Sequence, residues 1–189
     1  MTLNYVDKFP FSNGEPAPYA EWIRTHNSTG TVTDNPFSNR DPRLYQSVMV
    51  PGGPFRDRVA QMWEGGGSED LVNYAKDRAA TGFCNRKYLW DYNRATFYDK
   101  PMNYSYMRLA EVYLAYAEAL NEYKDERTVR EEALIYVNKI RTRAGIRTYT
   151  FGNSDAQNIH VDDNQETVRK IIRAERRVEL CGEGVRYDD

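Results

Sequence analysis

One segment of the sequence, YSYMRLAEVYLAYAEALNE at residues 104–122, is apolar on nearly every side of a helix and still contains charged residues. Arg108, Glu111 and Glu118 interrupt it. A helix on the surface of a soluble protein keeps one apolar stripe and one polar face, so this one needs neighbours that cover it and satisfy its charges. We expect a helix inside a layered helical assembly. Its apolar or small residues recur at helical spacing: Leu109, Val112, Tyr113, Tyr116, Ala117 and Leu120.

A second helix is predicted near residues 128–144. It begins with TVRE, in which Thr128 and Glu131 have the spacing of a capping box, and Gly145 is a natural C-terminal stop. The short link from the preceding helix indicates an antiparallel hairpin. Its spacing matches the second helix of a tetratricopeptide repeat, a pattern that any helical hairpin has a fair chance of reproducing. The matching residues are Ala133, Val137, Ile140 and Gly145.

A third helix is predicted near residues 164–182, starting after Asp163 with Glu166 three residues later. The segment between the second and third helices is predicted to be a loop. The apolar face of the third helix consists of Val168, Ile171, Ile172 and Val178.

Acidic residues lie on that apolar face. Glu175 falls between Ile171 and Val178, and Glu179 lies at the edge of the stripe. A carboxylate in such a place must pair or become protonated, because an isolated buried charge is very costly. Arginine suits the partner role, because its planar guanidinium can bind a carboxylate in two places. We therefore predict buried or half-buried ion pairs among Arg108, Glu111, Arg141, Arg143, Glu175, Arg176 and Glu179.

The alternative is that Glu111, Glu175 and Glu179 are catalytic acids, since paired carboxylates can hydrolyse glycosides. The many nearby arginines argue against it, because they lower carboxylate pKa values where acid catalysis needs one raised. We predict no catalytic residue and no hydrolase activity.

The first half of the chain has a different character. Seven of the eight prolines lie in the first 54 residues, and helical periodicity is poor apart from SEDLVNYAKDR at residues 68–78. We expect residues 1–100 to be mostly loops and turns, with one or two short helices or strands. So long a structureless stretch is expected to pack on a scaffold. The chain is thus interpreted as a loop-rich segment, 1–100, packed on a helical scaffold, 101–189, in one structural unit.

Composition and spacing exclude several classes of function. The net charge is −2 without a basic block, so a nucleic-acid partner is not expected. No apolar run approaches membrane-spanning length. His26 and His160 have no Cys or Glu at ligand spacing, and Asp162 and Asp163 favour helix capping over calcium binding. We expect no metal and no cofactor.

Three blocks in fixed order, RLAEVYLAYAEALNE, ALIYVNKIRTRAGI and IIRAERRVELCGEGVRYDD, resemble the RagB/SusD family over residues 104–189. NRDPRLYQSVMVPGGPF and TGFCNRKYL also resemble loop elements of the family's C-terminal half. The resemblance implies a mainly α fold of tetratricopeptide-like helical hairpins, an α–α superhelix, with a long loop-rich N-terminal elaboration. It also implies a non-catalytic lipoprotein of the outer membrane of Bacteroidetes, which binds oligosaccharides, polysaccharides or other nutrients and covers a TonB-dependent, SusC-like transporter.

Family members are far longer, and nothing here matches their N-terminal half with its lipid-attachment cysteine. The family pattern also continues beyond EGVRYDD, where this sequence stops. We therefore expect a fragment of a surface-exposed protein, with membrane contact only through a lipid anchor absent from this chain. The alternative function is a tetratricopeptide-like interaction module that contacts a transporter or other partner without binding glycan directly.

A glycan site needs aromatic faces for sugar C–H surfaces and polar groups for hydroxyls. Trp63 is the best candidate, because the following GGG run permits an exposed loop, and Asp70 and Asn73 could supply hydrogen bonds nearby. Trp22 is a weaker candidate. The alternative is that Trp63 packs against the scaffold and pins this loop.

Overall fold

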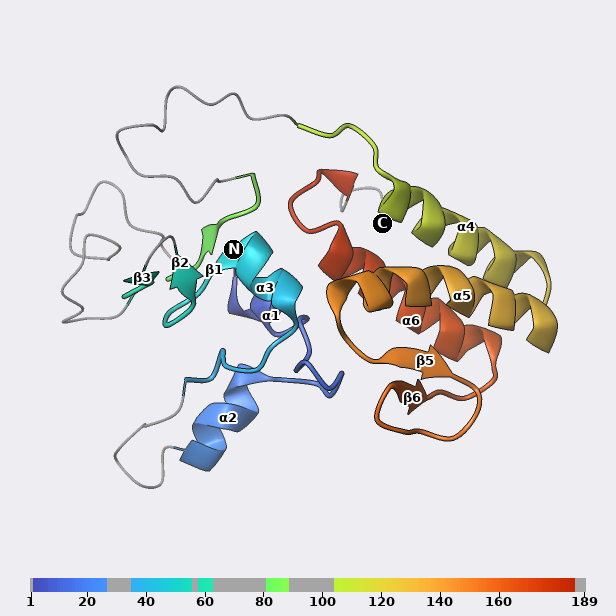
Figure 1. Ribbon diagram of the computed structural model, residues 1–189, viewed down its shortest axis with the longest axis horizontal. Coiled ribbons are helices and arrows are strands. Elements are labelled where there is room, and N and C mark those ends of the chain that lie inside the picture. Colours follow the sequence, from blue (N-terminus) through green and yellow to red (C-terminus); the bar gives the residue numbers. More distant parts are fainter. Residues whose placement is uncertain (1, 27–34, 56–57, 63–80, 89–103, 186–189) are drawn as a thin grey trace. The chain divides into compact units, whose positions relative to one another are not determined.

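The computed structural model of the chain describes residues 2–26, 35–55, 58–62, 81–88 and 104–185 (Figure 1). The chain divides into two compact units. The first consists of Met1–Phe11 and Pro16–Tyr104, and the second of Ser12–Glu15 and Ser105–Asp189. That residues 1–100 pack on the helical scaffold as one structural unit stays a prediction.

The second unit contains the predicted hairpin and third helix. Helix α4 (Leu109–Tyr123) and helix α5 (Arg127–Ala144) form the hairpin, and α6 (Gln165–Glu179) packs against both (Figure 1). Gly145 ends α5 in the left-handed conformation at φ 74°, where a glycine is favoured. The predicted mainly helical fold class and these elements are confirmed, with α4 starting at Leu109 because Arg108 is extended.

The predicted capping box of α5 is wrong. The N-cap is Glu126, without a side-chain cap, and the helix starts at Arg127. Thr128 therefore lies inside the first turn, where its hydroxyl is not at the capping position. Glu131 accepts a hydrogen bond from Arg127 Nε at 2.9 Å and pairs with that side chain one turn earlier.

The N-cap of α6 is Asn164, one residue after the predicted start signal. Its Oδ1 accepts a hydrogen bond from Thr167 N at 2.7 Å. Asp163, interpreted from the sequence as a capping residue, instead accepts a hydrogen bond from Arg130 Nε at 2.7 Å. An arginine within reach outcompetes the backbone for this carboxylate, because both partners are charged.

The apolar core of the second unit lies between the three helices. The predicted face of α6 is confirmed, since Val168 and Ile172 are fully buried. The predicted face of α4 is partly wrong: Leu109, Val112 and Tyr116 are 61%, 46% and 44% exposed. When apolar residues occur all round a helix, their spacing does not reveal which side of the helix is buried. In α4, small residues allow the neighbouring helices to approach closely. The buried residues of α4 are Ala110, Leu114, Ala117 and Asn121.

The segment between α5 and α6 was predicted to be a loop, and that prediction is wrong. It contains two parallel strands, β5 (Thr148–Thr150) and β6 (Asn158–His160), beside α5. The connection is short for parallel strands. It is held by the Asp155 carboxylate, which accepts hydrogen bonds from the backbone N–H groups of Gln157 at 2.7 Å and Asn158 at 2.6 Å.

A short piece of the N-terminal region belongs to the second unit. Arg147 Nη1 donates to Asn13 O at 3.2 Å, which ties residues 12–15 to β5. Gly14 has φ 86°, and a Cβ there would lie 2.3 Å from Ile159 Cδ1. Only glycine therefore fits at this position without displacing the Ile159 side chain.

A buried ion pair joins α5 to α6. Arg141 Nη1 lies 3.0 Å from Glu175 Oε2, and the two side chains are 2% and 4% exposed. Arg141 Nε also donates to Arg147 O at 2.6 Å, and the guanidinium lies 4.0 Å from the ring centroid of Tyr149. Arg141 is one of the arginines considered from the sequence as partners for Glu175, and it lies within ion-pair distance of that carboxylate.

A second group of charges joins the start of α4 to the end of α6. Glu179 accepts hydrogen bonds from Arg108 and Arg143, and Arg108 Nε also lies 2.7 Å from Glu183 Oε2. Burial disfavours the charged form of Arg108, but the hydrogen bonds from Arg108 to Glu183 and Glu179 more than compensate, so the pKa of Arg108 is raised.

Two other residues of the predicted ion-pair set lie at the margin of this layer. Glu111 is half-buried on α4, and within the part of the chain that the structure describes it takes part in no ion pair. Arg176 is half-buried in the last turn of α6, where its carbonyl accepts a hydrogen bond from Leu180 N at 2.9 Å.

The first unit has more regular structure than the sequence predicted. Its described helices are α1 (Leu3–Val6), α2 (Tyr19–His26) and α3 (Pro42–Ser47). Strand β1 (Val48–Met49) pairs antiparallel with β4 (Cys84–Asn85), and β2 (Pro54–Phe55) pairs antiparallel with β3 (Arg58–Val59). The helix predicted at residues 68–78 lies outside the described residues.

Buried charges in the NRDPR segment organise the first unit. The Arg40 guanidinium donates to Val6 O at 2.9 Å and to Phe9 O, and so satisfies carbonyls at the end of α1. Asp41 accepts from Arg43 N at 2.9 Å and caps α3, with Pro42 in the first turn. Burial lowers the pKa of Arg40 from its ordinary value. Among the described residues, no helix is long and apolar enough to cross a membrane.

Acid should weaken the contact between the end of α4 and the start of α6. Hydrogen bonds from Arg169, at 2.6 and 2.7 Å, lower the pKa of Glu122. The resulting stabilisation is complete above the unfolded-state pKa of about 4.3 and is lost as the pH falls through the folded-state value. Melting temperatures of the parent and Glu122→Gln, measured from about pH 7 to 3, should therefore converge on acidification. A gap that stays constant with pH would contradict this.

Removing Glu175 should strand Arg141 in the core. We expect Glu175→Ala to lower the free energy of unfolding by about 3–5 kcal/mol, the usual cost of breaking a buried pair. The control is Glu118→Ala, because Glu118 is 33% exposed and 3.7 Å from Arg173; this change should cost about 1 kcal/mol or less. Denaturant unfolding of both variants measures the difference. Equal losses would show that the Arg141–Glu175 pair does not stabilise the fold.

Candidate ligand-binding site

The predicted ligand residues are described only in part. Trp63, Asp70 and Asn73 lie outside the described residues, so they stay a prediction. Trp22 lies in α2 and is half-buried. Its indole stacks on the ring of Tyr19, with centroids 6.0 Å apart and planes at 11°.

Trp22 belongs to a row of aromatic rings in the first unit. Tyr19 stacks in turn on Phe37, with centroids 5.8 Å apart, and Phe37 meets Phe83 edge-on at 5.7 Å. Phe37 and Phe83 are buried. The row therefore holds the indole in a defined orientation at the edge of the core, which is the kind of support that a sugar-stacking residue needs.

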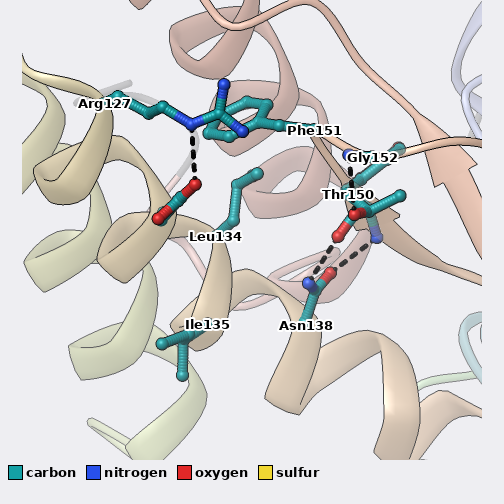
Figure 2. Close-up of a pocket in the computed structure, with 9 residues that line it drawn as sticks. Arg127, Leu134, Ile135, Asn138, Thr150, Phe151 and Gly152 are labelled. Atoms are coloured by element: carbon teal, nitrogen blue, oxygen red, sulfur yellow. Dashed lines mark hydrogen bonds and ion pairs between the residues drawn. The ribbon is translucent and has the colours of Figure 1, made fainter.

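The second unit contains an open pocket between α5 and the segment that begins with β5 (Figure 2). Its volume is about 330 Å³. One wall is a face of α5 and the other is the chain from β5 into the following turn, as Figure 2 shows. We call it the α5–β5 pocket. The lining residues are Arg127, Glu131, Leu134, Ile135, Asn138, Tyr149, Thr150, Phe151 and Gly152.

Hydrogen bonds between backbone and side chains fix the two walls to each other. Asn138 Nδ2 donates to Tyr149 O at 2.8 Å, and Tyr149 N donates to Asn138 Oδ1 at 2.8 Å. Gly152 N donates to Thr150 Oγ1 at 3.0 Å, which shapes the turn after β5 (Figure 2). The two walls of the pocket are therefore held together by hydrogen bonds within the scaffold itself.

The mouth of the pocket combines a charge pair with apolar surface. Arg127 lies over the ring of Phe151, 5.6 Å from its centroid, and binds Glu131 through Nε (Figure 2). Leu134 is 4% exposed, whereas Ile135 is 53% exposed. A ligand here would meet aliphatic and aromatic carbon together with a guanidinium and a carboxylate.

Sequence reasoning missed this pocket. Its residues come from one helix and from a segment that was predicted to be an irregular loop. The one available signal was Asn138, a polar residue in the middle of a helix next to core positions, which needs a hydrogen-bond partner when half-buried.

The buried carboxylates form a layer of ion pairs between the helices. Glu175 is bound by Arg141, and Glu179 by Arg108 and Arg143. Within the described part of the chain, no group of His, Cys, Asp and Glu could hold a metal ion.

Comparison with known proteins identifies the family. The model of the SusD family matches residues 1–189. SusD-like protein P2 of Formosa agariphila is 41% identical over 87 residues, which are 46% of this chain and 16% of the relative. The matched segment thus spans only 16% of the length of this curated relative.

Two solved structures from Bacteroides fragilis have the same fold. A SusD-like protein is 24% identical with a TM-score of 0.67, and a SusD-like carbohydrate binding protein is 23% identical with a TM-score of 0.66. Each match covers 98% of this chain and 34% of the solved chain. These matches confirm the tetratricopeptide-like helical scaffold that the sequence predicted. With the family model matching from end to end, the chain belongs to the SusD family.

Proposed function

We propose that this chain is part of a non-catalytic protein that binds glycans for nutrient uptake at the outer membrane of a Bacteroidetes bacterium. The observation that carries the proposal is the match of the SusD family model to residues 1–189. One of the similar solved structures is itself a carbohydrate binding protein. The proposed partner is a TonB-dependent, SusC-like transporter, and the proposed attachment to the membrane is a lipid anchor.

The charge arrangement supports the non-catalytic part of the proposal. Glycoside hydrolysis usually needs one carboxyl group with a raised pKa next to a second, ionised one. The buried carboxylates of Glu175 and Glu179 instead form ion pairs with arginines of the neighbouring helices. These carboxylates stabilise the packing between the helices, and glycan binding is proposed for other surfaces.

We propose Trp63, with Asp70 and Asn73, as the main glycan contact, and Trp22 as a second one. An indole offers a large flat apolar face for a sugar ring. Trp22 stacks on Tyr19, so its ring plane is supported from within the first unit. The other three residues are proposed from the sequence alone.

Glycan binding is tested by affinity gel electrophoresis of the intact protein against a set of soluble polysaccharides. We expect at least one polysaccharide to retard the protein, without release of reducing ends. Trp63→Ala should raise the dissociation constant obtained from the retardation about tenfold or more, because it removes a stacking face. Trp22→Ala should raise it by a smaller factor for the same reason. The matched control is Tyr123→Ala, since Tyr123 is 83% exposed at the end of α4. Unchanged retardation of a stably folded Trp63→Ala variant would remove Trp63 from the site.

A second candidate function is a protein-interaction module that binds the transporter without binding glycan. The observation that favours it is an exposed surface on the hairpin, which we call the tyrosine face. Tyr116 and Tyr136 meet edge-on at 4.8 Å, and Lys139 Nζ lies 4.5 Å from the ring centroid of Tyr136. Tyrosines and exposed aliphatic groups are typical of protein interfaces. The face consists of Leu109, Val112, Tyr113, Tyr116, Tyr136 and Lys139.

The interaction function is tested by co-purification of the SusC-like transporter with the intact protein. Val112 is 46% exposed at the centre of the tyrosine face, so Val112→Glu should abolish a contact made there without unfolding the helix. Thr128→Glu is the control, because Thr128 is exposed in the first turn of α5, where an acidic residue is favourable. Equal recovery of transporter with both variants would exclude the tyrosine face. Retention of the transporter together with no polysaccharide retardation would favour this second function.

A further inference from the structure

We propose that the α5–β5 pocket binds one residue of a neutral sugar, as a site on the helical scaffold separate from the tryptophan contacts proposed above. The inference rests on the proposed function, because it assumes that the protein meets glycans. It is carried by the size, charge and hydrogen-bonding groups of the pocket itself.

The size of the pocket limits the ligand. Ligand pockets in proteins have volumes of roughly 300–1,000 Å³, and this one, at about 330 Å³, is at the lower end. A protein partner would instead need about 800 Å² of surface on each side. The pocket therefore suits a small group such as a single sugar ring at the end or side of a chain.

The charges of the pocket favour a neutral ligand. Arg127 lies 2.9 Å from Glu131 and 3.3 Å from Asp163, so its charge is already balanced by carboxylates. An anionic ligand would meet these carboxylates without compensation, and a cationic one would meet the guanidinium. A hydroxyl group, which both donates and accepts hydrogen bonds, can bind to either member of the Arg127–Glu131 pair.

Polar groups on both walls have hydrogen-bonding capacity left. The Thr150 hydroxyl accepts from Gly152 N, so its own proton can still be donated. The Asn138 amide uses one N–H for Tyr149 O and has a second. Only one oxygen of Glu131 accepts from Arg127 Nε. The residues that carry these donors and acceptors line the same pocket, which a ring bearing hydroxyl groups can fill.

The apolar part of the pocket fits the C–H face of a sugar. Ile135 is 53% exposed, and the ring of Phe151 forms part of the same lining (Figure 2). Sugar binding buries such carbon surface while the hydroxyls reach the polar rim. Ile135 is therefore the apolar contact that binding would cover, and Glu131 is the polar one.

The test uses the intact protein and four probes: the methyl glycosides of D-glucose, D-galactose, D-mannose and D-xylose. Saturation-transfer difference NMR measures the dissociation constant of each. We expect saturable binding of at least one probe. Glu131→Gln should weaken it about tenfold, since it removes a charged hydrogen-bond acceptor. Ile135→Ala should weaken it by a smaller factor, because it removes apolar contact area.

The matched control is Glu132→Gln, the same substitution one position along α5, where the exposed Glu132 lies outside the pocket lining and near Tyr116. Its dissociation constant should equal that of the parent. No saturable binding of any probe, or equal binding by Glu131→Gln and Glu132→Gln, would overturn the proposal. Polysaccharide retardation of the same preparation separates the two failures. If a polysaccharide retards the protein but the pocket variants bind the probes as the parent does, only the pocket site is excluded. If no polysaccharide retards the protein, the proposed function is excluded.

Discussion

The burial of Arg141 is the constraint on which the second unit depends. Its guanidinium binds Glu175 of α6, the carbonyl of Arg147 before β5, and the ring of Tyr149. A guanidinium that is 2% exposed is tolerated only while such partners surround it, because removing one leaves a charge stranded in the core. The position of α6 beside α5, and that of β5 beside the same helix, are therefore coupled through one side chain.

The sequence predicted the ion-pair layer better than it predicted the surfaces. The two glutamates on the apolar stripe of α6 needed positively charged partners. Arginines at the start of α4 and the end of α5 were available as such partners. The face of α4 could not be predicted, because apolar residues surround that helix. Ala110 and Ala117, and not the larger Leu109 and Val112, lie against the partner helices. Local signals also failed at Thr128, because the Arg127–Glu131 pair formed instead of a capping box.

The α5–β5 pocket could not be predicted from the sequence either, because one of its walls has no periodic pattern. Strands β5 and β6 are three residues each and lie in a segment rich in turn-forming residues, so no period could emerge. Besides the Arg141 contacts, a pair of bonds from Asn138 to a backbone position eleven residues away holds β5 against α5. Because the Asn138 side chain binds backbone groups, the type of amino acid at the partner position does not reveal the contact. The sequence instead favoured Trp63 as the glycan contact, because a run of three glycines follows this aromatic residue.

The bonds within the α5–β5 pocket lower what sugar binding would cost there. Its walls are joined by the Asn138–Tyr149 hydrogen bonds, so a ligand finds the groups already arranged. A single sugar makes few contacts and cannot offset a large ordering cost. A monosaccharide glycoside should therefore select for this pocket, where the binding groups are held in place before the ligand arrives.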